Sequence, residues 1–410
     1  MEYGKLNVRV VSDTTSFPIQ NATVRITSEN EPEKVIEEAN TNSEGQLNDI
    51  ELEAPPLEYS MEPSANKPYS EYTIYISAPG FETIEVNGAE IFSGETAIQE
   101  ASLLPTAQGE PESAELYVIP DHTLWGDYPP KIEESEIKTV EETGEIVLSR
   151  VVIPEYVVVH NGPPSDSGAK DYYVKYKDYI KNVASSEIYS TWPEATLQAN
   201  ILAIQSFTLN RVYTEWYRNK GYEFTITTST AYDHKWIPNR NIFDSISKAV
   251  DSVFSNYLSR PNVQQPILTQ YCDGRNVSCP NWLSQWGSKA LGDQGFSAIE
   301  ILRNYYGDSI YINSTEEISG IPSSYPGTPL RQGDSGEKVR QMQRQLNVIS
   351  NGYPLIPKLS EDGVFGPVTE KAVKTFQRIF NLTQDGIVGF RTWYKISEIY
   401  VAVSRIAELN

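Results

Sequence analysis

The sequence of 410 residues contains only two cysteines and three histidines. Two cysteines are too few to hold a small secreted scaffold together through disulfides. Cys272 and Cys279 are spaced C-x6-C, which is not a usual zinc-binding pattern. We therefore predict no metal and no cofactor, and the two cysteines either form a local disulfide or remain buried thiols.

The sequence also lacks a long apolar run and a basic segment. No stretch approaches the roughly 20 apolar residues of a membrane-spanning helix. The first residues, MEYGKLNVRV, show no basic region followed by an apolar one, so no secretory signal is visible and a soluble protein is expected. No segment carries the excess of Lys and Arg that phosphate contacts need, which argues against a nucleic-acid partner.

Charge is distributed unevenly along the chain. Residues 1–150 contain 8 Lys+Arg and 30 Asp+Glu, so they carry the whole net charge of −22, whereas residues 151–410 contain 25 of each kind. Such asymmetry suggests that the acidic part has a separate role, as a solvating domain or as a detachable propiece. At roughly 100–200 residues per domain the length predicts two to four domains, and the patterns below indicate three.

Residues 1–104 show the alternation that is typical of β-strands. Leu6, Val8 and Val10 alternate with polar neighbours, and turn signals such as Asn87-Gly88 separate the runs. This pattern predicts a small all-β sandwich. The segments FPIQNATVRI, TNSEGQ and YTIYISAPGFETIEV resemble the carboxypeptidase-regulatory-like, or transthyretin-like, domains. That resemblance implies a non-catalytic domain.

Residues 105–150 are rich in Glu and Pro and contain few large apolar residues, so they are expected to form an exposed linker. Proteases cut such segments preferentially. The change in charge falls at Arg150-Val151, directly before the apolar run VVIPEYVVV. We therefore predict activating cleavage between Arg150 and Val151, with an ordinary interdomain linker as the equally supported alternative.

Residues 151–318 are predicted to form a mixed α and β domain, in which Glu187 lies at the end of a short helix. Tyr179, Ile180, Val183 and Ala184 recur at helical spacing, and Glu187 continues their face. Burial raises a carboxyl pKa, and so does the last turn of a helix, because the macrodipole is negative there. Both effects favour a general acid. The alternative is that Glu187 merely caps or pairs at the helix end, and spacing alone favours this alternative.

A long helix is predicted to follow. Thr191 and Glu194 match a T-x-x-E capping box, with Pro193 in the first turn. The apolar face of this helix runs through Leu197, Ile201, Ile204, Leu209 and Val212. It is therefore expected to be the central core helix of its domain. Strands are predicted over 222–228 and 266–271, helices over 244–254 and 298–306, and a hinge over 319–336.

Residues 337–410 are predicted to form a third, helical domain, which contains a repeat of the frame D-G-x-x-G-x-x-T. The frame begins at Asp362 and again at Asp385, where Asp-Gly makes a turn and the second Gly precedes a helix. The threonine is expected to accept a bond from amides of the first helical turn. The run LRQGDSGEKVRQMQRQLN and the two repeats closely resemble the peptidoglycan-binding domain of cell-wall hydrolases, a small helical bundle. This resemblance implies peptidoglycan as a partner.

Two further segments resemble the SpoIID-like lytic transglycosylases. The first is DYIKNVASSEIYSTWPEATLQANILAIQSFTLN, in which Glu187 stands at the family's catalytic glutamate, and the second is NWLSQWGSKALGDQGFSAIEILRNYYG. The resemblance implies that Ser284, Gln285 and Trp286 of an S-Q-W-G motif line the glycan cleft. Hydroxyl and amide groups hold sugar hydroxyls, and an indole stacks on a sugar ring. For Trp286 a simple core position is the alternative, and Tyr271 is a weaker candidate for substrate binding.

The family reaction is a cleavage of glycan without water. Glu187 would protonate the oxygen between N-acetylmuramic acid and N-acetylglucosamine and then take a proton from the 6-hydroxyl, which closes a 1,6-anhydro ring. A hydrolytic muramidase ordinarily needs a second carboxylate. Asp233 and Asp273 are available, but both lie in short polar segments that are typical of solvated turns.

Some SpoIID proteins hold zinc through His and Cys in one loop, where this sequence has Ser229, Thr230 and Tyr232 with only His234 nearby. We therefore predict no metal, which also argues against a zinc-dependent amidase. His234 is expected to be structural or exposed. A non-catalytic wall-binding or scaffold protein is the alternative from a different class.

The whole order of parts resembles the spore cortex-lytic enzymes of clostridia. This resemblance implies a zymogen stored in the cortex or coat region of the spore, whose residues 1–150 are removed by a subtilisin-like protease. It also implies that cortex peptidoglycan is the substrate during germination. An attached charge of −22 would oppose docking on anionic peptidoglycan, and steric blocking of the cleft is an equally good account of latency.

Overall fold

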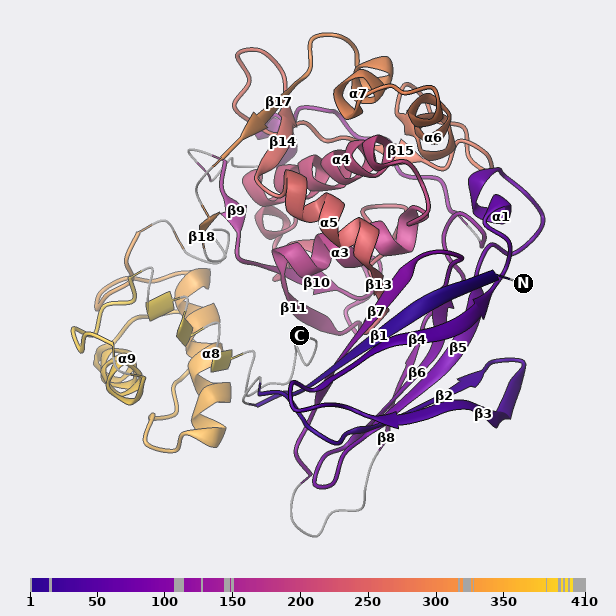
Figure 1. Cartoon of the computed structure of the whole chain (residues 1–410). Helices are drawn as coiled ribbons and strands as arrows, with labels where there is room; N and C mark the ends of the chain where they lie inside the picture. The colour runs from indigo at the N-terminus through magenta and orange to yellow at the C-terminus, as the bar shows by residue number, and fades with distance from the viewer. Residues whose placement is uncertain are drawn as a thin grey trace.

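The computed structural model describes residues 2–14, 17–106, 114–126, 128–143, 148, 151–315, 318–319, 326, 328–380, 382–389, 392–393, 395–396 and 399–400. Within these ranges the fold has an N-terminal β-rich region, a central α+β domain and a C-terminal helical domain, as the sequence predicts. Figure 1 shows them at lower right, top and left, respectively. None of the helices described in these ranges is long and apolar enough to cross a membrane.

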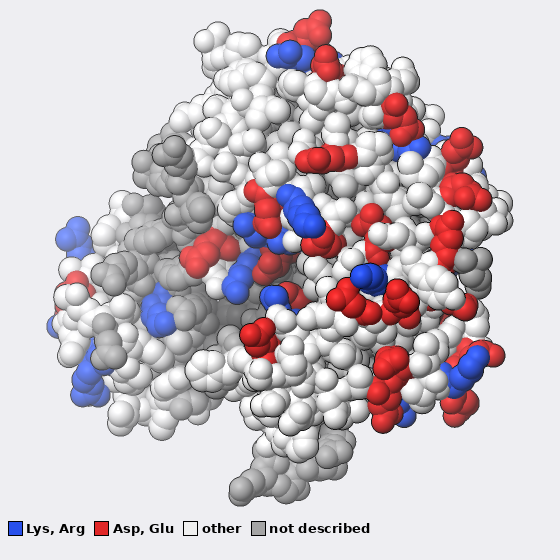
Figure 2. Space-filling view, viewed as in Figure 1, with Lys and Arg blue, Asp and Glu red and all other residues white. Residues whose placement is uncertain are grey.

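The N-terminal region is a sandwich of two sheets, because apolar and polar residues alternate along its strands. One sheet has the order β13-β7-β1-β4 and the other β3-β2-β5-β6-β8. The elements are β1 (Glu2–Ser12), β2 (Thr23–Ser28), β3 (Glu31–Asn40), β4 (Gln46–Ala54), α1 (Glu58–Met61), β5 (Ser70–Ser77), β6 (Thr83–Ile91), β7 (Thr96–Leu103) and β8 (Ala114–Val118). Figure 2 shows Asp and Glu gathered over this region.

The sandwich is joined to the central domain through a buried interface. Strand β13 (Ile242–Phe243) of the central domain pairs with β7 and so extends the first sheet. An ion pair of 2.7 Å links Arg240 to Glu90, and both side chains are at most 1% exposed. Asn241 exchanges two hydrogen bonds with the backbone of Glu90, at 2.9 and 3.0 Å. Burial raises the pKa of Glu90 to about 7 against the opposing effect of Arg240.

The segment after the sandwich differs from the predicted exposed linker. Strand β8 belongs to the second sheet, where it pairs in parallel with β6. Further along, Lys131 and Lys138 are only 6% and 2% exposed. The prediction of an exposed, loosely structured segment is therefore wrong for β8 as a structured strand and for these two lysines, whereas Leu116, Val118 and Ile132 are exposed as predicted. Composition could not reveal this burial, because the partners that satisfy these polar groups lie far away in the sequence.

The central domain surrounds α4 (Glu194–Tyr213), whose residues are buried on nearly all sides, which confirms the predicted core helix. The other elements are α2 (Val140–Thr143), β9 (Ile153–Pro154), β10 (Tyr156–His160), β11 (Asp171–Lys175), α3 (Tyr176–Glu187), η1 (Arg218–Lys220), β12 (Ile226–Thr227), α5 (Asp244–Val253), β14 (Asn256–Ser259), β15 (Tyr271–Cys272), β16 (Leu283–Ser284), α6 (Gln285–Asp293), α7 (Ala298–Tyr306), β17 (Tyr311–Ser314) and β18 (Ile318–Ser319). The strands predicted over 222–228 and 266–271 are only two residues long in the structure, as β12 and β15.

The predicted capping box of α4 is wrong. Pro193 is the N-cap residue, and no side chain caps the helix. The Thr191 hydroxyl instead donates to the Ser60 hydroxyl of the sandwich at 2.8 Å. A tertiary partner has therefore replaced the local bond that the motif predicts.

The C-terminal domain has a core of its own, built around α8 (Glu337–Gly352) and α9 (Pro367–Ile379). The two repeats are held by the same pattern of side-chain hydrogen bonds. Gln343 on α8 donates to Asp362 and Thr369 at 3.0 and 3.2 Å, and Gln377 on α9 donates to Asp385 and Thr392 at 2.8 and 3.3 Å. Each repeat is thus fixed by a glutamine from the preceding helix, whereas the sequence predicted that backbone amides would bond each threonine.

Candidate active site

Glu187 is the last residue of α3 and is fully buried, as the helical spacing predicts. Its Oε1 accepts the backbone N–H of Lys235 at 2.6 Å, and its Oε2 accepts the hydroxyl of Tyr271. Its own carbonyl accepts the side-chain amide of Gln285 at 3.1 Å. The residue is thus held by three segments that are far apart in the sequence, which is what a fixed catalytic side chain requires.

Burial raises the pKa of the Glu187 carboxyl. This effect outweighs the opposing effects of the Lys131 charge, the Tyr271 hydroxyl and both the N–H and the charge of Lys235. The hydrogen bonds come from neutral groups, a phenol and an amide. The carboxyl therefore holds a proton more tightly than an exposed glutamate does. A carboxyl whose pKa is raised in this way is suited to donate a proton and to take one back.

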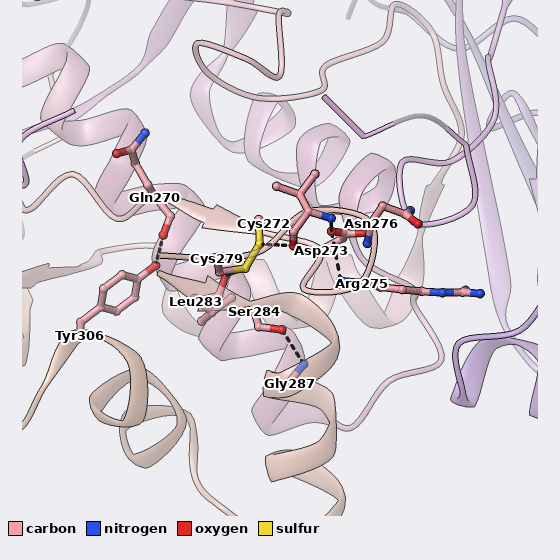
Figure 3. The surroundings of a disulfide bond; sticks show 11 residues. Gln270, Cys272, Asp273, Arg275, Asn276, Cys279, Leu283, Ser284, Gly287 and Tyr306 are labelled. Carbon is pink, nitrogen blue, oxygen red and sulfur yellow. Dashed lines mark hydrogen bonds between the residues drawn. A yellow bond between two sulfur atoms is a disulfide. The ribbon is translucent and has the colours of Figure 1, made fainter. Parts of the chain in front are cut away.

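Tyr271 stands on β15 and is followed directly by Cys272, which forms a disulfide with Cys279 (Figure 3). Of the two alternatives for the cysteines, the disulfide is therefore correct. The bond closes a loop in which Asp273 accepts backbone N–H groups at 2.8 to 3.3 Å. This loop fixes the end of the strand that presents Tyr271 to Glu187.

Asp233 and Asp273 are both fully buried, so the prediction of solvated turn aspartates is wrong. Arg211 donates to Asp233 Oδ1 at 2.8 Å, and Tyr217 donates to Oδ2 at 2.6 Å. The carboxylate of Asp273 accepts hydrogen bonds from backbone N–H groups of the loop that contains it (Figure 3). Both carboxylates therefore serve the fold and are already saturated with donors.

The S-Q-W-G residues lie at the start of α6, close to the end of α3. Ser284 caps α6 by accepting the N–H of Gly287 at 3.0 Å (Figure 3), and Gln285 holds the Glu187 carbonyl. Trp286 packs against Trp192 and Tyr189, with ring centroids 5.0 and 5.8 Å away, and is 9% exposed. Gln285 is fully buried. Contact of these residues with a glycan stays a prediction.

Sequence reasoning missed Lys131, which lies beside the Glu187 site. Its Nζ donates to the carbonyls of Thr230 (3.2 Å) and Asp233, and it lies 4.7 Å from the centroid of the Tyr271 ring. Lys131 belongs to the Glu- and Pro-rich stretch, where nothing in the local pattern distinguishes it from an exposed lysine. Only its tertiary position reveals it.

His234 is fully buried and structural. Its Nδ1 lies 3.0 Å from the Tyr179 hydroxyl, and its ring stacks with that of Tyr271 at a centroid distance of 5.9 Å. Across the part of the chain that the structure describes, no three His, Cys, Asp or Glu side chains are grouped to hold a metal ion.

The predicted cleavage site falls partly outside the described residues, because Arg150 is not among them. Val151 is described and is 7% exposed, and its carbonyl accepts the hydroxyl of Thr315 at 3.0 Å. Cleavage between these two residues stays a prediction.

Two family models match this chain. The model of the stage II sporulation protein SpoIID matches residues 169–259, which include α3, Glu187 and α4. The model of a peptidoglycan-binding domain matches residues 335–396, which include α8 and α9. A SpoIID region joined to a peptidoglycan-binding domain supports a role at the bacterial cell wall.

Curated relatives match over short stretches. The zinc D-Ala-D-Ala carboxypeptidase of Streptomyces albus G is 43% identical over 77 residues, which are 18% of this chain and 28% of that protein. The N-acetylmuramoyl-L-alanine amidase CwlL of Bacillus licheniformis is 35% identical over 78 residues, 19% of this chain and 21% of that protein. The chain thus spans about a quarter of the length of either relative.

Among solved structures, the SleB N-terminal domain is similar at 32% identity. The match covers 18% of this chain and 93% of that one, with a TM-score of 0.16.

Proposed function

We propose that this protein is a peptidoglycan lytic transglycosylase of the spore cortex, with Glu187 as its acid and base. The observation that carries the proposal is the burial of Glu187 among neutral donors, which raises the pKa of its carboxyl. The SpoIID match around this residue and the peptidoglycan-binding match at 335–396 supply the substrate class.

In the proposed reaction the protonated Glu187 carboxyl donates its proton to the glycosidic oxygen between N-acetylmuramic acid and N-acetylglucosamine. The bond from the anomeric carbon to that oxygen breaks. The 6-hydroxyl of the muramic acid then attacks the anomeric carbon while the Glu187 carboxylate takes the hydroxyl proton. One C–O bond breaks and one forms, no water is consumed, and the carboxyl regains its proton.

Tyr271 and the Lys235 N–H support this proton cycle, because they hold both carboxylate oxygens in place through neutral donor groups. A hydrogen bond to the ionised form stabilises it at the moment when the first proton has left. The carboxylate therefore stays oriented while it changes charge.

The state of the neighbouring aspartates favours a mechanism with one carboxylate. A hydrolase that uses a general base or a nucleophile needs a second carboxylate beside the scissile bond. Asp233 and Asp273 are occupied by Arg211 and by loop amides, respectively. A hydrolytic muramidase, an amidase and a non-catalytic wall-binding protein are the alternatives that the reaction products distinguish.

The biological setting is proposed from the order of the parts. An acidic N-terminal region, a SpoIID domain and a wall-binding domain resemble SleC, the cortex-lytic enzyme of clostridial spores. We therefore place the protein in the cortex or coat region as a zymogen that a subtilisin-like protease activates at Arg150-Val151 during germination. The N-terminal sequence of the protein from germinated spores checks this point, and a mature start far from Val151 would refute that site.

The reaction is tested on purified cortex peptidoglycan with the full chain after treatment with a subtilisin-type protease. Mass spectrometry of the released fragments should show 1,6-anhydro-muramic ends. Reducing ends without anhydro sugars would establish a hydrolase, and freed peptides an amidase. An absence of products would leave only wall binding.

The role of Glu187 is tested with Glu187→Gln and a matched control, Glu194→Gln. Glu194 begins α4, is exposed, and differs from Glu187 in having no place in the site. Glu187→Gln should lower product formation by about 10³-fold while wall binding is kept, and Glu194→Gln should leave both unchanged. An active Glu187→Gln enzyme would show that another group is the acid.

A further inference from the structure

Residues 132–138 lie on the central domain as an open stretch of chain whose backbone is bound by other segments. The N–H of Ile132 donates to the carbonyl of Ala231 at 2.7 Å, and its own carbonyl accepts the side-chain amide of Gln270 at 2.7 Å. The same glutamine accepts the N–H of Glu134 at 2.9 Å. One side chain of the central domain therefore binds two backbone groups of this stretch, two residues apart.

The backbone contacts continue toward the other end of the stretch. The N–H of Leu268 donates to the carbonyl of Glu136 at 2.8 Å. Gln265 accepts the N–H of Lys138 at 2.7 Å and donates to its carbonyl at 3.1 Å. Main-chain hydrogen bonds of this kind hold a peptide whatever its side chains are. The central domain thus has a surface that is built to bind the backbone of a peptide.

Two arginines of the central domain bind the carboxylates of the same stretch. Arg211 donates to Glu134 through two nitrogens, at 2.9 and 2.6 Å. Arg260 donates to Glu136 through two nitrogens, at 2.7 Å each. A bidentate pair matches a carboxylate in shape as well as in charge. The peptide groove, which consists of Arg211, Arg260, Gln265, Leu268 and Gln270, therefore recognises a peptide with acidic groups two positions apart.

Both arginines lose these carboxylates when residues 1–150 leave the enzyme, as the proposed activation requires. Arg211 is 1% exposed and keeps its bond to Asp233 through a third nitrogen. The partners that Arg260 keeps among the described residues are neutral, a hydroxyl and a carbonyl at 2.7 Å each. Guanidinium N–H groups in such a recess are unfavourable without an acceptor. The emptied groove is therefore ready to bind carboxylates from another source.

One end of the peptide groove lies next to the candidate active site. Gln270 is followed directly by Tyr271, whose hydroxyl donates to Glu187, and the Gln270 carbonyl accepts the Tyr306 hydroxyl at 2.7 Å (Figure 3). The muramic acid of peptidoglycan carries a short stem peptide with free carboxylates on its lactyl group. A muramic acid placed at Glu187 would therefore bring its peptide to the groove.

We propose that the peptide groove of the processed enzyme binds the acidic stem peptide of peptidoglycan, with Arg211 and Arg260 as the receptors of its carboxylates. The inference rests on the proposed function and names a part of the substrate, beyond the glycan, that this site recognises. Glu134 and Glu136 of the uncut chain occupy the places that the substrate carboxylates take later. Arg260 is then a residue that determines specificity, and it acts on substrate binding instead of on the proton transfer.

A binding measurement with the stem peptide alone tests the groove without any need for activity. The probe is the tetrapeptide L-alanyl-γ-D-glutamyl-diaminopimelyl-D-alanine, and isothermal titration calorimetry measures its affinity. The uncut chain, whose groove is filled, gives the background binding of the wall-binding domain. After treatment with a subtilisin-type protease, the wild type should bind the peptide at least about tenfold more tightly than the uncut chain. The same peptide with amidated carboxyls should lose this gain.

Arg260→Gln removes one carboxylate receptor and leaves the pair between Arg211 and Asp233 intact. Processed Arg260→Gln should bind the peptide about tenfold more weakly than the processed wild type. Arg260→Lys should bind about threefold more weakly, because lysine keeps the charge but not the bidentate geometry. Arg303→Gln is the matched control, since Arg303 is an exposed arginine of α7 that donates to a carbonyl of its own domain. It should bind as the wild type does, and circular dichroism verifies that each variant is folded.

Equal binding by the uncut and processed wild type would overturn the proposal, and so would unchanged binding in folded Arg260→Gln. Activity separates this proposal from the proposed function. On cortex glycan, processed Arg260→Gln should have a KM raised about tenfold with kcat unchanged, and removal of the stem peptides by an amidase should abolish the difference. Peptide binding without anhydro products would leave the groove intact and refute the reaction. Anhydro products from an enzyme that binds no peptide would refute the groove alone.

Discussion

The surroundings of Glu134 and Glu187 show two ways in which this protein holds a carboxylate that is largely removed from water. Glu134 binds a guanidinium through both oxygens and is also paired with Lys138 at 2.6 Å. Burial opposes its ionisation, but these cations lower the pKa of Glu134 to about 2. Glu187 receives its hydrogen bonds from a phenol and an amide, and burial raises its pKa.

Under the proposed function, the comparison teaches that the kind of donor decides whether a carboxylate serves the fold or the reaction. Direct contact with arginine fixes the charge of Glu134, so it can anchor a segment but cannot exchange a proton. Neutral donors fix the position of Glu187 and leave its proton available. Each change predicted below alters the surroundings of Glu134 or of Glu187, and the change with the largest expected effect comes first.

Removal of the arginine should have the largest effect. Arg211→Met should lower the free energy of unfolding by about 3–5 kcal/mol, because it leaves Asp233 fully buried without its cation and leaves Glu134 with Lys138 alone. Urea denaturation of the full chain measures the loss. Arg344→Met is the control, since Arg344 is 47% exposed in its pair with Glu223 and should contribute less than about 1 kcal/mol. Equal losses would contradict the structural role of Arg211.

The two glutamates should give stability profiles with opposite slopes in pH. The pKa of Glu134 is depressed from 4.5 to about 2, so its contribution is present above 4.5 and disappears as the pH falls toward 2. Relative to Glu134→Gln, the wild type should therefore be up to about 3 kcal/mol more stable at pH 7 and lose this advantage in acid.

Glu187 should behave in the opposite way. Because its folded pKa is raised, the folded state binds the proton more tightly, and wild-type stability falls as the pH rises through that pKa. Glu187→Gln should therefore gain stability over the wild type with rising pH. Urea unfolding at pH 3, 5 and 8 measures both profiles, and slopes of the same sign would remove the distinction between the two carboxylates.

Loss of the disulfide should have a moderate effect. Cys272→Ala/Cys279→Ala should lower the free energy of unfolding by about 2 kcal/mol, as expected for a short closed loop. The loop follows Tyr271 directly, so product formation should fall as the hydrogen bond to Glu187 loosens. Mild reduction of the wild type should reproduce both changes, whereas a reduced protein with full activity would show that Tyr271 is held without the disulfide.

The smallest predicted effect concerns one hydroxyl. Tyr271→Phe keeps the ring and removes the donor to Glu187, so product formation should fall about tenfold. Since a donor to the ionised form lowers a carboxyl pKa, the alkaline limb of the pH–rate profile should move to higher pH. Tyr213→Phe at the end of α4 should change neither quantity. An unmoved alkaline limb would show that Tyr271 does not tune the acid.

Local patterns predicted those parts of the molecule that local chemistry controls. Helical spacing placed Glu187 on the buried face of α3 and α4 at the centre of its domain, and the D-G-x-x-G-x-x-T repeat indicated the turns of the C-terminal domain. The capping box failed because Thr191 found a hydroxyl of the sandwich instead of its own helix. The prediction that Asp233 is a solvated turn residue failed because the buried Arg211 binds its carboxylate inside the domain, although the surrounding sequence is polar.

The sequence by itself determined the three regions, the unequal distribution of charge and the glutamate at the end of a helix, since each follows from the order and spacing of neighbouring residues. Only the tertiary structure decided which groups surround that glutamate. Tyr271 and the Lys235 amide bind it from distant segments, and the charge of Lys131 acts on it from a third. The reason is that burial and donor identity set a carboxyl pKa, and both depend on contacts that no local pattern records.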